Sequence, residues 1–509
     1  LPGAPPVPDR GGVSRPYPAA YDVHGEPVMT SPAPRSPLRL RLYAWVAGVL
    51  LGSLEGVLAV VVAGGAGRGA ATAGLPGGGS GVEEATGGAL GAANPAPAVP
   101  VALVLCAMVV VGALCGPRLS RLLGRRVADL GAGALIVAGA LLAAALTGGE
   151  GPLGARTAGA VVAGLVGPAA AGAGAGLLLL VAPQVCHELS LPGHRRLMPQ
   201  AMALMPAGAA LVVLGGTLGA RWLPDPARGA WLGVLVLGAV HLGVGISLPE
   251  SPVWLAERGG DVRAFEALRR LHGNLEAAVA VDWARHEAGM AREQQRLTAA
   301  DLRIPQIRQA TVTSVVLVVA QEAPLGAAAL VLAPAVADHL GGGARTVAAA
   351  CVGWGVVSVL ALLLGRVETL ERLRFLRVVL GSVVAVVAAT VLVTTTSAGG
   401  GGPSDADLPG GALAGTVVGC LVALVAGQYV LVLPACQGAV DPQIPPWLVG
   451  TQRRLVAVGQ SLAHAGAIVV PLLVYQRWGL DVVGWVMFTL TVVALAVVLV
   501  RMPRALRAA

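Results

Sequence analysis

The sequence predicts an all-α, polytopic membrane protein with twelve transmembrane helices in two groups of six. Of the 509 residues, 55% are hydrophobic and only 12% are charged, which is about half the charged fraction of a water-soluble domain. Apolar runs long enough to cross a bilayer follow one another along the chain. One charged stretch, at residues 249–308, divides these runs into two sets. A soluble enzyme and a disordered chain are both excluded.

Residues 1–37 are rich in Pro, Gly, Ser and Arg and lack an apolar run, so we expect a disordered cytoplasmic tail. The apolar runs then predict an N-terminal six-helix bundle at 38–248 and a C-terminal six-helix bundle at 309–501, followed by a short cytoplasmic tail at 502–509. The predicted spans lie at 43–65, 98–117, 128–147, 157–185, 198–220, 229–248, 309–334, 346–365, 376–396, 411–434, 453–475 and 479–501.

Residues 249–308 carry charged residues at helical spacing. Phe265, Leu268 and Leu271 form an apolar stripe with Arg269 and Arg270 between them, which predicts an amphipathic helix. We therefore expect a helical cytoplasmic loop between the two bundles.

Arginine distribution predicts the orientation. The chain has no lysine, and only six of its 35 basic residues fall on the side opposite the N-terminal tail. Cytoplasmic loops retain arginine, so both termini are predicted to be cytoplasmic. The net charge of +8 is thus explained by topology, and no nucleic-acid partner is expected. We expect the plasma membrane, with an intracellular vesicle membrane as the alternative; the oligomeric state stays open.

Motifs for catalysis are absent from the sequence. The six cysteines lie in or beside apolar runs without metal-type spacing, and no glycine fingerprint for a nucleotide follows a strand. We expect no enzyme activity, no metal and no cofactor.

The most specific string is Pro249-Glu250-Ser251-Pro252-Val253-Trp254-Leu255, directly after the sixth run. Ser251 can cap a helix that has Pro252 in its first turn. The string also resembles the Pro-Glu-Ser-Pro-Arg-Trp-Leu signature of the sugar porter family in the major facilitator superfamily. Residues 120–126, Ser-Arg-Leu-Leu-Gly-Arg-Arg, are similar to that family's turn between spans two and three.

The resemblance implies the major facilitator fold and gating by ion pairs at the cytoplasmic ends of the two bundles. Acids and arginines there would pair when the transporter opens outward and separate when it opens inward. The matching positions in this chain are Arg121, Arg125, Arg126, Glu188, Arg195, Glu250, Glu368 and Arg372.

The animal facilitative glucose transporters are the most similar branch. Leu51-Gly52-Ser53-Leu54 opens span one as in that branch, and Ala320-Gln321-Glu322 stands where it has a Gln-Gln pair. This implies facilitative transport of a hexose, of glucose or fructose type, or of a related polyol, by alternating access. Ala59 replaces the aspartate of proton-coupled sugar porters, which also favours a uniporter.

The site departs from the hexose pattern. Ala203, Ala327 and Val356 occupy the register positions of sugar-contacting amides, and span ten lacks the Gly-Pro-x-Pro-Trp motif. Two alternatives therefore stay open. One is a transport-inactive scaffold that binds or senses, and the other is a carrier of a cationic or proton-coupled solute.

Polar residues within apolar spans are functional candidates, because the bilayer offers them no water. The predicted substrate-binding residues are Gln321, Glu322, Gln437, Gln428 and Glu55. Gln460 and His464 are also polar at this depth, and for His464 a packing role is the simpler interpretation.

Overall fold

The computed structural model describes residues 37–73, 98–147, 158–191, 201–219, 225–293, 301–305, 307–309, 311–312, 322, 325–340, 343–364, 371–398, 410–432 and 449–507. All regular elements within these ranges are helices. Ten are long and apolar enough to cross a membrane, and two more apolar helices, Met205–Thr217 and Gly326–Ala337, are shorter. The predicted fold class, an all-α multi-pass membrane protein, is confirmed.

The first group of helices contains the N-terminal half of the chain. α4 packs against α2 and α3, and α1 packs against α6 and α7. The members are α1 (Leu38–Ala73), α2 (Ala98–Leu123), α3 (Arg125–Thr147), α4 (Ala158–Leu189), α6 (Met205–Gly219) and α7 (Pro226–Ile246).

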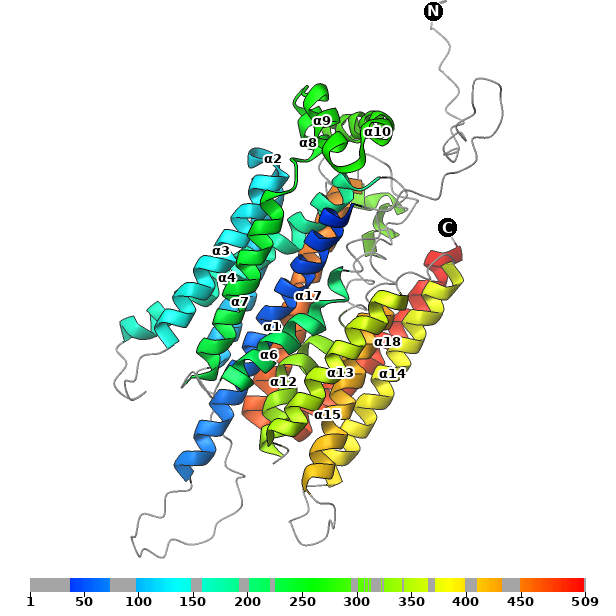
Figure 1. Ribbon diagram of the computed structural model, residues 1–509. Helices are drawn as coiled ribbons and strands as arrows, with labels where there is room; N and C mark the ends of the chain where they lie inside the picture. The colour runs from blue at the N-terminus through cyan, green and yellow to red at the C-terminus, as the bar shows by residue number, and fades with distance from the viewer. Residues whose placement is uncertain are drawn as a thin grey trace, which may run out of the picture.

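The second group of helices contains the C-terminal half of the chain. It meets the first group where α1 packs on α12, α6 on α13 and α2 on α17, so the centre of the protein is an interface between the halves (Figure 1). The members are α12 (Gly326–His339), α13 (Gly343–Leu364), α14 (Glu371–Ala398), α15 (Gly410–Ala426), the π-helix η4 (Gly427–Val432), α17 (Val449–Trp478) and α18 (Leu480–Arg507).

Three short helices lie at one end of the bundle, beside the start of α1 (Figure 1). They are α8 (Pro252–Glu257), α9 (Asp261–His272) and α10 (Asn274–Glu293), and a 3₁₀ turn, η3 (Asp301–Arg303), follows them. Leu268 of the predicted apolar stripe is buried among alanines of α9 and α10. Ser251 caps α8 by accepting from the Trp254 backbone N–H at 3.1 Å, with Pro252 in the first turn, as the sequence predicts.

Small residues bring α1 and α6 into backbone contact. A Cβ added at Gly52 would lie 1.9 Å from the Met205 carbonyl oxygen, and one at Gly48 would lie 1.8 Å from that of Ala201. Neither position can hold a larger residue without moving a backbone. Glycine and alanine are abundant here because they permit this close approach between membrane helices.

The outer helices present large apolar side chains on the outside of the bundle. Leu114 is 55% exposed, Val236 61% and Val352 65%. In water such a surface would aggregate, but it matches hydrocarbon. The exposed apolar surface therefore supports the membrane assignment independently of helix length.

Candidate functional site

Polar side chains meet at the centre of the helix interface. We call five of these residues the central cluster. They are Glu55 on α1, Glu322, the pair Gln428 and Tyr429 on η4, and His464 on α17. Glu55 and Glu322 are 4% and 5% exposed, and Gln428 is fully buried. Ionisable groups at this depth are costly to keep and mark functional sites.

His464 joins the two carboxylates. Its Nε2 lies 3.0 Å from Glu55 Oε1, and its Nδ1 lies 3.1 Å from Glu322 Oε2. The Tyr429 hydroxyl also donates to Glu55, at 3.2 Å from Oε1. Glu55 belongs to the first group of helices, while His464 and Tyr429 belong to the second. Both contacts therefore connect the two halves.

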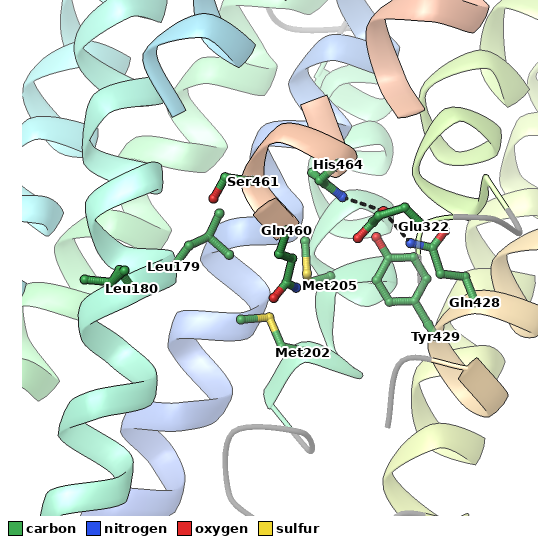
Figure 2. A pocket seen from close by; sticks show the side chains of 10 residues that line it. All are labelled: Leu179, Leu180, Met202, Met205, Glu322, Gln428, Tyr429, Gln460, Ser461 and His464. Atoms are coloured by element: carbon green, nitrogen blue, oxygen red, sulfur yellow. Dashed lines mark hydrogen bonds and ion pairs between the residues drawn. The ribbon is translucent and has the colours of Figure 1, made fainter. Parts of the chain in front are cut away.

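Gln428 orients Glu322. Its Nε2 donates to Glu322 Oε2 at 2.8 Å, and its Oε1 accepts the Ala327 backbone N–H at 3.3 Å. The residue lies in η4, and π-helical turns within membrane helices frequently accompany functional sites. Here the π-helix directs the adjacent side chains of Gln428 and Tyr429 to one cluster (Figure 2).

A cavity of about 30 Å³ adjoins the cluster, with room for one or two water molecules. Its lining comes from both halves and is apolar on the side of α4 and polar on the side of α17 (Figure 2). The lining residues are Leu179, Leu180, Met202, Met205, Glu322, Gln428, Tyr429, Gln460, Ser461 and His464. The volume is too small for a monosaccharide, so a solute of that size requires the halves to move apart.

A second group of ion pairs lies at the end of the bundle that carries α8. Arg125 at the start of α3 contacts Glu188 at 3.2 Å and Glu257 at 3.2 Å. Ser251 donates from its hydroxyl to Glu188. We call Arg125, Glu188, Ser251 and Glu257 the end cluster. All four belong to the N-terminal half or to the α8 segment that follows it.

The α8 segment docks onto the turn between α2 and α3. Glu250 Oε1 accepts from the Arg126 backbone N–H at 3.0 Å, and Trp254 Nε1 donates to the Arg121 carbonyl at 3.0 Å. Gly124 has a φ of +99°, and a Cβ there would lie 2.6 Å from Glu250 Oε2. The positive φ therefore favours glycine at this turn, and a Cβ would in addition displace the Glu250 carboxylate.

A third polar group lies wholly within the N-terminal half. Tyr43 donates to Asp129 Oδ1 at 2.6 Å, and His241 Nε2 lies 3.4 Å from the same oxygen. We call these three residues the α3 cluster. All three are at most 3% exposed, and they do not line the central cavity.

Three of the five predicted substrate-binding residues, Glu55, Glu322 and Gln428, come together in the central cluster. Gln321 and Gln437 lie outside the described residues. Of the predicted gating residues, Arg125 and Glu188 pair directly, and Arg121, Arg126 and Glu250 border them. Arg195 and Glu368 lie outside the described residues, and Arg372 is described only as part of helix α14.

Ala203, Ala327 and Val356 stand where the hexose pattern has sugar-contacting amides, and their surroundings in the structure differ. Ala327 offers the cluster only its backbone N–H, which Gln428 accepts. Ala203 is buried at 1% exposure, whereas Val356 is 53% exposed and faces away from the helix interface. Ser358, two residues later on α13, is buried, and its hydroxyl accepts the Ala207 backbone N–H of α6 at 3.0 Å.

Sequence reasoning misses Tyr429 and Glu257 and gives His464 a packing role. Glu257 is the last residue of the short helix α8, and its position in the sequence gives no signal of the contact with Arg125. Tyr429 gives no signal either, because its side chain is directed by a π-helix that periodicity does not predict. The α3 cluster is also unpredicted, since its members are 86 and 112 residues apart in sequence, at positions 43, 129 and 241.

Comparisons with known proteins agree with this geometry. The chain matches the family model described as sugar (and other) transporter over residues 93–434, which is more than half its length. No curated protein matches it in a sequence comparison.

Solved structures match nearly the whole chain. The xylose transporter XylE from E. coli, in a partially occluded inward-open conformation, is 19% identical with a TM-score of 0.63, over 90% of this chain and 97% of that one. XylE as a proton:xylose symporter bound to 6-bromo-6-deoxy-D-glucose is also 19% identical, with a TM-score of 0.65, over 90% of this chain and 94% of that one. At this identity the likeness shows the fold.

The helices have the major facilitator fold of the solved structures, and the matched family model describes transporters, not enzymes. Within this class the chain belongs to the family of sugar (and other) transporters.

Proposed function

We propose that this protein carries a hexose, of glucose or fructose type, or a related polyol across the membrane by alternating access. The observation that carries the proposal is the cavity between the halves, which the C-terminal half lines with amides, a phenol, a carboxylate and an imidazole and the N-terminal half with apolar side chains. These groups supply donors and acceptors for sugar hydroxyls. We also propose that the animal facilitative glucose transporters are the most similar branch of the family. This proposal is based on Leu51-Gly52-Ser53-Leu54 and Gln321.

The proposed layout keeps a cytoplasmic tail at 1–37, bundles at 38–248 and 309–501, a cytoplasmic loop at 249–308 and a cytoplasmic tail at 502–509. We place both termini in the cytoplasm, and the protein in the plasma membrane, on the arginine distribution. The helices α8–α10 and the start of α1 then share the cytoplasmic face (Figure 1).

Gating is proposed for the end cluster. Arg125 holds Glu188 and Glu257 within one half, so the cluster moves as a unit with the N-terminal bundle. Glu368 and Arg372 of the other half are the proposed partners that approach and leave it. If Arg125→Ala left the balance of inward-open and outward-open protein unchanged, this assignment would be wrong.

The transport proposal is tested with proteoliposomes of the purified full chain. We expect saturable uptake of radiolabelled D-glucose or D-fructose that exceeds uptake by empty liposomes. Gln321→Ala and Gln460→Leu should each lower uptake at least about tenfold, because a lost buried hydrogen bond to substrate is worth on the order of 1.4 kcal/mol or more.

Gln184→Leu is the matched control, because Gln184 lies on α4 but does not line the cavity. Its uptake should stay within about twofold of the parent protein. Folded protein that takes up neither sugar would refute hexose transport and favour the scaffold interpretation. The facilitative mode predicted from Ala59 is tested by repeating uptake with a pH gradient across the vesicle membrane.

A further inference from the structure

The contacts of His464 determine how many protons the central cluster must hold in the observed geometry. Both ring nitrogens lie within 3.1 Å of a carboxylate oxygen, Glu55 on one side and Glu322 on the other. A nitrogen and a carboxylate oxygen at that distance need a proton between them. A neutral imidazole carries only one N–H. The observed geometry therefore holds one further proton, on the imidazole or on a carboxyl group.

The extra proton has a structural consequence. Without it, one ring nitrogen becomes an acceptor facing an acceptor, and one of the two contacts is lost. Glu322 is also bound by Gln428, at 2.8 Å, and both lie in the C-terminal half. The contact between His464 and Glu55 joins different halves, so it is the one that a relative movement of the halves can break.

We propose that the central cluster is a proton-binding site. One exchangeable proton, shared among His464, Glu55 and Glu322, joins the two halves when it is bound and frees them when it is released. This inference rests on the proposed transport function and replaces its facilitative mode with a coupled one.

Other groups around the site are compatible with this role. Among the described residues, the titratable groups that face it are the Tyr429 phenol, which donates to Glu55, and the Cys106 thiol on α2, near Glu55. From α4 and from residues 201–205 the cavity receives only leucine and methionine side chains. These apolar neighbours separate the cluster from water and strengthen its electrostatic interactions.

The first test measures protons moved per solute. Proteoliposomes of the full chain carry a pH-sensitive dye, and D-glucose is added outside without an imposed gradient. We expect a change of lumenal pH that corresponds to about one proton per glucose in the parent protein, and no solute-driven proton movement in His464→Gln, because the shared proton is lost. The ratio does not depend on how fast the variant transports.

Asp129→Asn is the matched control, because Asp129 is also a buried carboxylate beside a tyrosine and a histidine but lies outside the cavity. It should keep the proton-to-glucose ratio of the parent. Glucose uptake without proton movement in the parent protein would overturn the proton site and leave the transport proposal intact. Movement of protons in His464→Gln at the parental ratio would also overturn it.

The second test is independent of transport and applies even if no glucose is carried, which would refute the transport proposal alone. Infrared difference spectra of the purified parent protein between acid and alkaline pH should contain a carboxyl band or a shifted carboxylate band that Glu55→Gln or Glu322→Gln removes and Asp129→Asn retains. Two substitutions are used, so that one that fails to fold does not decide the result. A spectrum without such a band, or a band that neither variant changes, overturns the proposal.

Discussion

The central cluster and the α3 cluster contain the same chemistry in different places. Each has a carboxylate that accepts from a tyrosine and faces a histidine: Glu55 with Tyr429 and His464, and Asp129 with Tyr43 and His241. The α3 cluster joins three helices of one half. The central cluster joins the halves to each other and adds a second carboxylate, Glu322.

The positions of the two clusters suggest different roles for them, one in helix packing and one in the proposed transport. Helices within one half keep their neighbours through a transport cycle, so a buried polar contact there serves stability. In the alternating access that we propose, contacts between the halves form and break. A carboxylate, tyrosine and histidine are therefore no functional signature by themselves, and their position relative to the interface between the halves decides the role.

The largest expected effect is on a contact within one half. Arg125→Ala leaves Glu188 and Glu257 without their cation in a mostly buried site, where Arg125 is 8% exposed and Glu188 10%. Removal of one partner from a buried ion pair costs about 3–5 kcal/mol. We expect a clearly lowered thermal unfolding midpoint in detergent.

Arg263→Ala on the exposed face of α9 is the control, with an expected change below about 0.5 kcal/mol. Equal stability of the Arg125 and Arg263 variants would contradict the end cluster as a structural unit.

Tyr43→Phe tests the α3 cluster next. It removes the 2.6 Å hydrogen bond to Asp129, and hydrogen bonds to charged groups contribute about 1.5–3 kcal/mol. Stability should fall by that amount, while the dependence of glucose uptake on pH stays as in the parent. A changed pH dependence with unchanged stability would reverse the roles assigned to the two clusters.

Ser251→Ala is expected to cost about 1–2 kcal/mol, because the hydroxyl both caps α8 and donates to Glu188. Ser251→Thr keeps a hydroxyl and should recover most of the loss. Limited proteolysis of the segment from α8 to α10 measures the effect locally. Faster cleavage is expected in the alanine variant, and identical cleavage of both variants would contradict the cap.

Tyr429→Phe should have the smallest effect on stability, about 1 kcal/mol or less, because its contact to Glu55 is longer, at 3.2 Å. Its effect should instead be on transport, since the lost hydrogen bond joins the halves. We expect an altered uptake rate with a nearly unchanged unfolding midpoint. A stability loss as large as that of Tyr43→Phe, with normal uptake, would remove the distinction between the clusters.

Much of the fold follows from local patterns in the sequence. Long apolar runs must form helices, since a bilayer gives backbone groups no other partner, and Ser251 with Pro252 marks the start of α8. Part of the candidate site follows as well. Glu55, Glu322 and Gln428 interrupt apolar runs at a cost that only a function or a partner can offset. Arg125 and Glu188 follow from motif positions, although the sequence predicts ion pairs between the two bundles and not this pair within one bundle.

Other parts of the site depend on geometry that no local pattern contains. The π-helix at Gln428 and Tyr429 shifts the helical register, so a period of 3.6 residues cannot predict where Tyr429 points. The orientation of Val356 away from the interface, with Ser358 facing inward, follows from the rotation of α13 against α6. Asp129 and His241 meet because α3 packs on α7, which the polarity of either residue does not specify.

The sequence by itself determined that this protein is a helical membrane transporter of the sugar (and other) transporter family, because composition, span length and signature motifs are properties of the chain read locally. Only the tertiary structure decided which buried acids share a histidine. Glu55 and Glu322 are 267 positions apart, and the distance between their carboxylates depends on how two separately packed halves meet.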